Sequence, residues 1–309
     1  MKISMIGAGK VGATTMYAIL EKGIASELAL IDINAQLAQG EAMDLMHATP
    51  FYRRTKIYSG GFERLKNSDI VIISAGAAQK EGETRLELSE KNARIMQSIS
   101  KNIKEYCENP IILVLTNPVD IMTAVVQKET GLNKNRVIGS GTVLDTMRLR
   151  SMISSNCSIS ASNAHVYIIG EHGDSEVAVW SQAKIGGVPI SAYSRECSNP
   201  DRCESCLEGL FEQTKNAAYE IINKKGATNF AIASATTHIV ETIIQNEKRI
   251  LTLSSPYEDI YIGYPGVLGK NGIERMIHLS LSEEEKRTFL HSVEIIRKQQ
   301  QQTFKTLYQ

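Results

Sequence analysis

His172 follows a short apolar run, residues 167–169, that breaks at Gly170, and it lies between the acidic residues Glu171 and Asp174. An imidazole gains and loses a proton near neutral pH, so a histidine placed in this way suits general acid–base catalysis. A carboxylate held beside such a ring stabilises its protonated form and fixes its orientation. We therefore predict that His172 is the centre of the chemistry.

A predicted helix after residues 139–142 carries three charged side chains, Asp145, Arg148 and Arg150. Asp145 and Arg148 are three residues apart and share a helix face, whereas Arg150 lies about 200° round from Arg148. The two arginines are thus expected to do different work. Taken alone, Asp145 and Arg148 also fit an ordinary surface ion pair.

The amino-terminal residues predict a dinucleotide site. A short apolar strand, residues 2–6, runs into Gly7-Ala8-Gly9-Lys10-Val11-Gly12 and then into a helical pattern ending near Lys22. In such a turn the glycines allow a tight bend, a close approach of backbone to pyrophosphate, and packing of helix on strand. A second strand, residues 28–31, ends in Asp32, whose carboxylate suits the ribose hydroxyls of NAD and repels the 2′-phosphate of NADP.

Two further buried strands, residues 69–76 and 110–115, end in polar segments. Ligands of open parallel sheets bind beyond the carboxyl ends of the strands. Residues 77–85 therefore have the character of a mobile lid before a helix over about 88–106, and Asn117 has the position of a substrate contact. A solvated loop and a turn formed by Asn117-Pro118 are the simpler alternatives.

The composition excludes several classes of protein. The 309 residues are 42% hydrophobic and 22% charged, with 34 basic and 34 acidic side chains, so a broad basic surface for nucleic acid or anionic membrane is not expected. No signal peptide or membrane span is predicted. Five cysteines form an odd, sparse set, which favours reduced thiols in the cytoplasm. Cys203 and Cys206 lack further ligands of metal-site spacing, so no metal is predicted.

Several ordered blocks of the chain resemble the lactate/malate dehydrogenase family, in particular its bacterial allosteric L-lactate dehydrogenases. The blocks are GAGKVG at 7–12, SAGAAQKEGETR at 74–85, TNPVD at 116–120, GSGTVLDTMRLR at 139–150 and IGEHGDSE at 169–176. The likeness extends over essentially the whole length, except for a polar insertion, residues 194–204, that departs from the family pattern. No function is assigned to that insertion or to Cys197, Cys203 and Cys206 in and beside it.

The resemblance implies an NAD-dependent enzyme of glycolysis and fermentation that interconverts pyruvate and L-lactate. It makes His172 the proton donor and acceptor, Asp145 the residue that orients it, and Arg85 the lid residue that polarises the reacting carbonyl. The implied substrate contacts are Gln79, Arg85, Asn117, Arg148 and Thr228. The implied cofactor contacts are Gly7, Gly9, Val11, Gly12, Asp32, Gly76, Asn117 and Ser140.

Gln79 bears on the choice of substrate. Malate dehydrogenases of the family tend to carry arginine at this position, whereas an uncharged amide leaves a second substrate carboxylate without a partner. Pyruvate is therefore predicted over oxaloacetate. A malate or broader L-2-hydroxy acid dehydrogenase, and a non-catalytic NAD-binding structural protein, are the alternatives.

Arg150 and His165 match positions at which bacterial members of the family bind fructose 1,6-bisphosphate between subunits. The resemblance thus implies an activator site and a homotetramer; a partly buried histidine and a surface arginine are the alternative. His165 and His172 are seven residues apart, so in an unbroken strand they would face opposite sides. The segment would then have one side toward the substrate and one toward a neighbouring subunit.

The order of predicted elements indicates an α/β fold, a Rossmann-type doubly wound parallel sheet followed by a second, α+β catalytic domain. We predict an NAD-binding domain over residues 1–143 and a substrate-binding domain over 144–309. The second domain is expected to hold extended structure over 160–183, helices over 206–225 and 229–246, a β-meander over 250–267 and a final helix capped by Ser282. Part of the 229–250 helix is a candidate to pack back on the first domain.

Overall fold

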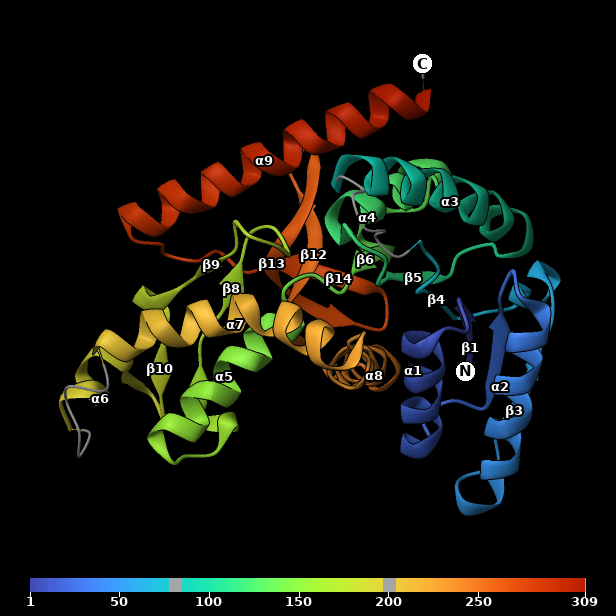
Figure 1. The fold of residues 1–309 in the computed structure, drawn as a ribbon, viewed down its shortest axis with the longest axis horizontal. Coiled ribbons are helices and arrows are strands. Elements are labelled where there is room, and N and C mark those ends of the chain that lie inside the picture. The colour runs from blue at the N-terminus through green and yellow to red at the C-terminus, as the bar shows by residue number, and fades with distance from the viewer. Residues whose placement is uncertain (78–84, 197–203, 309) are drawn as a thin grey trace.

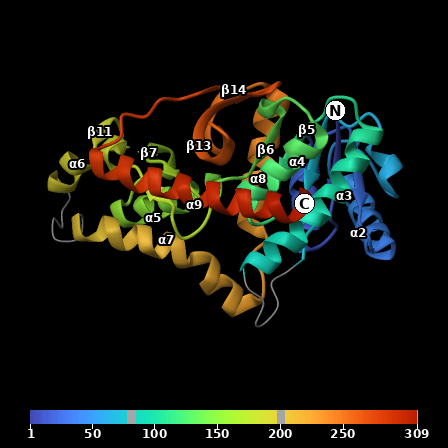
Figure 2. The same ribbon diagram turned by 90° about the horizontal axis from the view of Figure 1, so that it is seen from above.

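A nine-stranded sheet forms the backbone of the molecule, with the strand order β14-β13-β12-β6-β5-β4-β1-β2-β3. The computed structural model describes residues 1–77, 85–196 and 204–308, without the side chains of 85–86, 194–196 and 204–206. From β6 to β3 all neighbouring strands are parallel, the pattern of the doubly wound fold that the sequence predicts. Figures 1 and 2 show helices on both faces of this sheet.

The elements of the first half alternate regularly between strand and helix. They are β1 Lys2–Ile6, α1 Lys10–Lys22, β2 Glu27–Ile31, α2 Ala35–Ala48, β3 Lys56–Ser59, β4 Ile70–Ile73, α3 Arg85–Tyr106, β5 Ile111–Val114, α4 Val119–Thr130, β6 Val137–Gly139 and α5 Val143–Cys157. The second half contains short strands and long helices. They are β7 Ala164–His165, β8 Ile168–Ile169, β9 Val177–Ala178, β10 Lys184–Ile185, β11 Val188–Pro189, α6 Ile190–Glu196, α7 Glu204–Lys225, α8 Phe230–Gln245, β12 Arg249–Tyr257, β13 Ile260–Gly269, β14 Gly272–Met276 and α9 Glu283–Tyr308.

Alternate residues of the parallel strands belong to different hydrophobic cores. In β4, Ile70 and Ile72 pack in the core that contains α1, α2 and α8, whereas Val71 and Ile73 pack in the core that contains α3, α4 and α9. Successive side chains of a strand point to opposite faces, so a strand buried on both faces must be apolar throughout. The continuous apolar runs in the sequence follow from this arrangement.

The carboxy-terminal strands extend the same sheet. The sequence placed a β-meander over 250–267 in the second domain; in the structure β12, β13 and β14 form antiparallel pairs, and Ser254 of β12 pairs with Gly139 of β6. Helix α8 packs on α1. A third core, containing α5, α7, β7 and β10, lies in the part of the chain that departs from strand–helix alternation.

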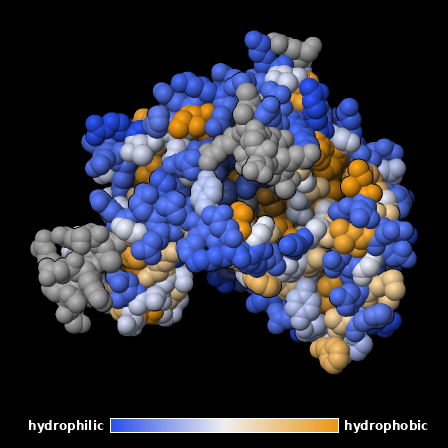
Figure 3. Space-filling view, viewed as in Figure 1, coloured by the Kyte–Doolittle hydropathy of each residue, from blue (hydrophilic) through white to orange (hydrophobic). Residues whose placement is uncertain are grey.

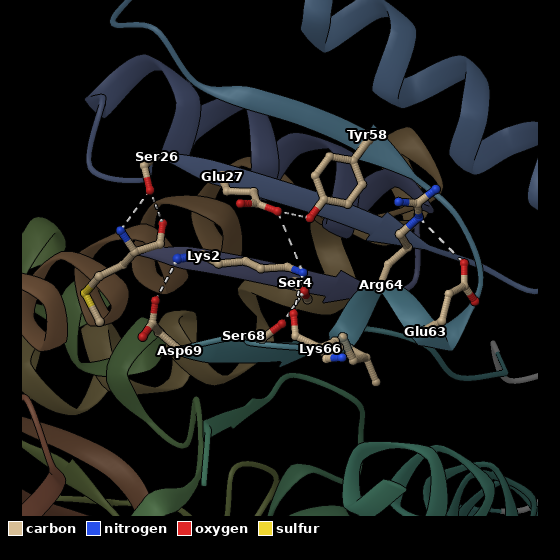
Figure 4. Close-up of polar contacts among 12 residues, drawn as sticks. Lys2, Ser4, Ser26, Glu27, Tyr58, Glu63, Arg64, Lys66, Ser68 and Asp69 are labelled. Atoms are coloured by element: carbon tan, nitrogen blue, oxygen red, sulfur yellow. Dashed lines mark hydrogen bonds and ion pairs between the residues drawn. The ribbon is translucent and has the colours of Figure 1, made fainter. Parts of the chain in front are cut away.

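A polar cluster closes the amino ends of β1, β2 and β3 (Figure 4). Lys2 donates through its backbone N–H to Asp69 at 2.7 Å and through Nζ to the Lys66 carbonyl at 2.7 Å. Glu27 lies 3.8 Å from Lys2 Nζ and also accepts a hydrogen bond from the hydroxyl of Tyr58. This end of the sheet is the opposite one to the glycine turn, and its polar groups bond to one another.

Helix α9 crosses much of the molecule (Figure 1). It begins as predicted, with the Ser282 hydroxyl accepting from the Glu285 N–H at 3.2 Å and the Glu285 carboxylate accepting from the Ser282 N–H at 2.8 Å. Farther along, Ser292 and Thr303 are buried against the segment after β8 and against α3. Among the described helices, none is long and apolar enough to cross a membrane.

Candidate active site

His172, Asp145 and Arg148 form a hydrogen-bonded group. His172 Nδ1 lies 2.6 Å from Asp145 Oδ2, and Arg148 Nη1 lies 2.9 Å from Asp145 Oδ1. Asp145 and Arg148 therefore share one face of α5, as their spacing predicts. Their side chains are only 5% and 12% exposed, so the surface ion pair considered from sequence alone is wrong.

Hydrogen bonds between α5 and β8 bring the aspartate and the histidine together. Thr142 donates to the Ile168 carbonyl at 2.6 Å, and Thr146 accepts from the Ile168 N–H at 3.0 Å. Asp145, which lies in the helix between these two threonines, consequently faces the turn that follows β8 and meets His172 there. That turn begins at Gly170, whose φ of 97° lies in the region that favours glycine.

The His172 backbone is held from two other elements. Asp120, in the first turn of α4, accepts from the His172 N–H at 3.0 Å. Ser292 of α9 accepts from the neighbouring Glu171 N–H at 2.8 Å and lies 2.9 Å from the Ser175 hydroxyl. The turn that carries His172 is thus held by α4, α5 and α9, which are far apart in the sequence.

The carboxylates around His172 favour its protonated form. Burial by itself lowers the pKa of His172, but the charge and hydrogen bond of Asp145, aided by Asp120 and Glu176, raise it overall to about 9. Burial opposes ionisation of Asp145, but His172 and Arg148 outweigh it and hold the pKa of Asp145 below its usual value. The pair is therefore suited to hold a proton that can be given to a substrate.

Two buried carboxyl groups beside this pair were missed by sequence reasoning. Asp120 is 2% exposed and Glu176 is 5% exposed, and one oxygen of each has no hydrogen-bond partner among the described residues. Burial foremost raises the pKa of Asp120 to about 6 and that of Glu176 to about 8. Asp120 is the last residue of the block TNPVD and Glu176 is the last residue of IGEHGDSE, but their burial depends on contacts with distant elements.

The turn after β1 has the features of a site for a dinucleotide. A Cβ at Gly12 would lie 1.9 Å from the Gly7 carbonyl oxygen, so helix α1 can approach the strand only with glycine at this position. Gly9 caps α1 with extended backbone and no side-chain hydrogen bond, and Val11 lies in the first turn of the helix. The N–H groups at this end are suited to a phosphate. Asp32 accepts from the Ala8 N–H at 2.7 Å, which places its carboxylate beside the turn.

The ends of β4, β5 and β6 lie at the same edge of the sheet. Asn92 of α3, another residue that the sequence did not single out, accepts from the Ala77 N–H at 2.7 Å and donates to the Asn117 carbonyl at 2.8 Å. It thereby joins the segment beginning at Gly76 to that containing Asn117. Ser140 is buried after β6, and its N–H donates to the Val114 carbonyl at 3.0 Å.

Two predicted site residues lie outside the described part of the chain, namely Gln79 and the side chain of Arg85. The same holds for Cys197, Cys203 and the side chain of Cys206, to which the sequence assigned no function. Thr228 is described and lies half-buried just before α8. Cys107 is buried and Cys157 is half-buried, and no group of three possible metal ligands occurs among the residues with a described structure.

Arg150 and His165 lie apart from the His172 group. The Arg150 guanidinium donates to the Val166 carbonyl from Nε and Nη2, at 3.2 and 3.1 Å, and lies 5.6 Å from the Tyr167 ring centre. His165 is exposed in β7, whereas His172 is half-buried in the turn after β8. The two histidines thus have different surroundings. Because the chain breaks between β7 and β8, the alternation of side chains along one strand does not determine the directions of His165 and His172.

The fold, the glycine turn and the hydrogen-bonded pair of His172 and Asp145 together define a cofactor-dependent oxidoreductase. Residues 1–139 match the model of the lactate/malate dehydrogenase NAD binding domain, and residues 142–307 match that of the α/β C-terminal domain. The chain belongs to the lactate/malate dehydrogenase family, and its cofactor is NAD(H).

Similar proteins are L-lactate dehydrogenases. That of Pseudothermotoga lettingae is 48% identical, with 96% of this chain and 95% of the relative covered. That of Acetivibrio thermocellus is 49% identical, with 92% and 91% covered. Among solved structures, a lactate dehydrogenase from a Medee basin deep-sea metagenome has a TM-score of 0.94 at 42% identity, covering 98% of both chains. The minor L-lactate dehydrogenase of Enterococcus mundtii also has a TM-score of 0.94, at 39% identity, covering 97% of this chain and 98% of that one.

Proposed function

We propose that this enzyme interconverts pyruvate and L-lactate, with residues 1–143 binding the cofactor and residues 144–309 carrying the substrate chemistry. The observation that carries the proposal is the buried group His172–Asp145–Arg148, in which one carboxylate bonds to both cations. Its relatives named L-lactate dehydrogenase support the choice of substrate.

Each residue of the group has a separate task in this proposal. NADH, when bound, supplies the hydride for the 2-oxo carbon. Protonated His172 gives its proton to the carbonyl oxygen, and Asp145 keeps the ring oriented and charged. Arg148 uses Nη1 for Asp145 and has further N–H donors for the substrate carboxylate. Arg85 and Asn117 act on the reacting oxygen, Thr228 forms a wall of the pocket, and Ser140 adjoins the nicotinamide.

Gln79 supports pyruvate over oxaloacetate, because burial of a second carboxylate beside an amide is unfavourable. The test is the kcat/KM of the purified enzyme for pyruvate, oxaloacetate and 2-oxoisocaproate, measured by NADH absorbance. We expect pyruvate to have the highest value. Faster turnover of oxaloacetate would favour a malate dehydrogenase, and no turnover of any 2-oxo acid would leave a non-catalytic NAD-binding protein.

We further propose a cytoplasmic homotetramer activated by fructose 1,6-bisphosphate at Arg150 and His165. Neither residue has a carboxylate partner within the described structure, so both remain suited to an anion. Exposed apolar side chains on and beside α2, including Leu37, Met43, Met46 and Phe51, support association between copies (Figure 3). Fructose 1,6-bisphosphate should lower the apparent KM for pyruvate and increase the mass measured by light scattering; no response at any pH contradicts the activator site.

A further inference from the structure

Glu176 is a buried acid that the mechanism above does not use. It lies four residues after His172, immediately before β9, and is 5% exposed. Its backbone N–H donates to the Gly173 carbonyl at 3.3 Å. Its Oε1 atom is fully covered and has no hydrogen-bond partner among the described residues. An ionised carboxylate in such a place loses hydration without full compensation.

The charged groups that face Glu176 come from three elements. Asp145 and Arg148 belong to α5, His172 to its own turn, and Lys215 to α7. Burial foremost, and then the negative charge of Asp145, raise the pKa of Glu176 to about 8 against the opposing effect of the three cations. Lys215 also has a partner of its own, Glu212 of the same helix, at 3.5 Å.

The balance of charge depends on the proton of Glu176. When Glu176 is neutral, Asp145 offsets the protonated His172, and Arg148 keeps a positive charge that is not fully balanced within the site. When Glu176 is ionised, a second carboxylate acts on the same two cations. An anionic substrate at Arg148 would then add a third carboxylate to a poorly hydrated space, where like charges repel strongly.

We infer that the 2-oxo acid binds to the form of the enzyme in which Glu176 carries a proton, and that binding draws this proton from solution. Glu176 would thus set the affinity for an anionic substrate through charge, without touching the reacting atoms. The proton goes from water to a Glu176 oxygen, and no bond of the substrate changes. The inference rests on the proposed contact between Arg148 and the substrate carboxylate.

This linkage can be separated from that of His172. Binding of a 2-oxo acid also favours protonated His172, but that group has a pKa of about 9, and Glu176 has one of about 8. Affinity should therefore fall in two stages as pH rises. Above each pKa, a required proton adds a further loss of about tenfold per pH unit.

The experiment compares the wild type with Glu176→Gln, which keeps size and removes the charge. The probe is oxamate, the unreactive amide analogue of pyruvate, titrated into NADH-saturated enzyme between pH 6.5 and 9.5 with NADH fluorescence as the readout. We expect the wild-type Kd to rise in two stages from about pH 8, reaching about a hundredfold per pH unit, and the variant Kd to rise in a single stage of about tenfold per pH unit through His172 alone. The matched control, Glu208→Gln at an exposed position of α7, should follow the wild type.

A two-stage rise that persists in Glu176→Gln overturns the inference, and so does an equal loss of affinity at every pH, which indicates packing alone. If the variant does not fold, proton uptake on oxamate binding to the wild type decides the question. Toward pH 9.5 we expect uptake of more than one proton for each oxamate bound, whereas His172 alone can take up at most one. Failure of oxamate to bind even at pH 7, with no reduction of pyruvate, would instead contradict the proposed function.

Discussion

Two arginine–histidine pairs occupy the same two segments of the chain, α5 and the residues from β7 to the turn after β8. Arg148 and His172 share the buried carboxylate of Asp145, at 2.9 and 2.6 Å. Arg150 bonds to the Val166 carbonyl, and His165 in β7 is exposed. Burial lowers the pKa of Arg150, and no described carboxylate compensates for it. Pairs made of the same residue types therefore have opposite electrostatic surroundings.

The difference indicates how one helix can serve two sites. A step of two residues turns the side chain about 200° round the helix, so Arg148 and Arg150 leave α5 on different sides. A cation with an internal carboxylate is held in a fixed orientation and supports a stable proton on its neighbour. A cation whose hydrogen-bond partner is only a backbone carbonyl can bind an anion from solution.

Replacement of the internal carboxylate should remove most of this difference and have the largest effect. In Asp145→Asn the charge that raises the pKa of His172 is lost, while burial continues to lower it. The pKa of His172 should fall from about 9 to below neutral, and kcat for pyruvate reduction at pH 7.5 should drop by roughly 10²- to 10⁴-fold.

The measurement for Asp145→Asn is the pH profile of both directions. Reduction needs the protonated ring, so activity should recover partly as pH falls, and lactate oxidation should reach its plateau at lower pH than in the wild type. A variant profile that still bends near pH 9 would show that Asp145 does not set the pKa of His172.

Exchange of arginine for lysine should distinguish the two cations of α5. Lysine cannot bond to Asp145 and to a substrate carboxylate with the same planar geometry. Arg148→Lys is therefore expected to raise KM for pyruvate about 10- to 100-fold, the size of one or two lost charged hydrogen bonds. Arg150→Lys is the matched comparison, and its KM should change less. Equal changes in KM for both variants would contradict the separate roles.

The regular half of the fold was accessible from sequence because its signals are local. The turn from Gly7 to Gly12 and the carboxylate at Asp32 lie within one βαβ unit, so spacing alone places them together. The spacing of Asp145 and Arg148 likewise predicted their shared helix face, confirmed by their 2.9 Å contact. The resemblance added the pairing of Asp145 with His172.

The remaining features depend on contacts between distant segments. Asp120, Glu176, Asn92 and Ser292 have no local pattern that marks them, because their burial arises from contacts between distant segments. Helices α4 and α9 pack against the turn after β8, and α3 packs against the segments after β4 and β5. The antiparallel strands were predicted as a meander. Their junction with β6 is a single pair of residues in antiparallel register, Ser254 and Gly139, and hydrophobic periodicity does not reveal it. The sequence thus indicated the reacting groups better than the residues that hold them.

Removal of the Asp120 charge should have a smaller effect on the His172 group. Asparagine keeps an oxygen that can accept from the His172 N–H, and its amide can donate to the neighbouring Ser254 Oγ. The pKa of His172 should fall by less than one unit in Asp120→Asn, and kcat at pH 7 should change only a few-fold. NMR titration of the ring or the pH profile of kcat measures this shift.

The same variant should gain stability at neutral pH. Burial raises the pKa of Asp120 from 3.8 to about 6, so its ionisation costs more in the folded state than in the unfolded chain. That cost is absent below pH 4 and grows until about pH 6, so Asp120→Asn should be stabilised on the order of 1 kcal/mol at pH 7 and not at pH 4. Urea unfolding at the two pH values is the test, and a gain of the same size at both would exclude the charge as its cause.

Substitutions of Arg150 and His165 are expected to have the smallest effect on the enzyme without activator. They should appear only as a loss of the response to fructose 1,6-bisphosphate. Arg150→Gln removes a cation that is not bonded to His172, Asp145 or Arg148 in the described structure, but leaves a side chain that can still donate to the Val166 carbonyl. The ratio of KM for pyruvate without and with fructose 1,6-bisphosphate should fall toward one, because a bisphosphate held by two subunits loses a charged contact from each. His165→Gln should reduce the same ratio less, since an imidazole offers fewer N–H donors to an anion than a guanidinium. If both variants keep the wild-type ratio, the activator site lies elsewhere, and the difference between the two pairs then reflects packing around Tyr167 instead of a second ligand.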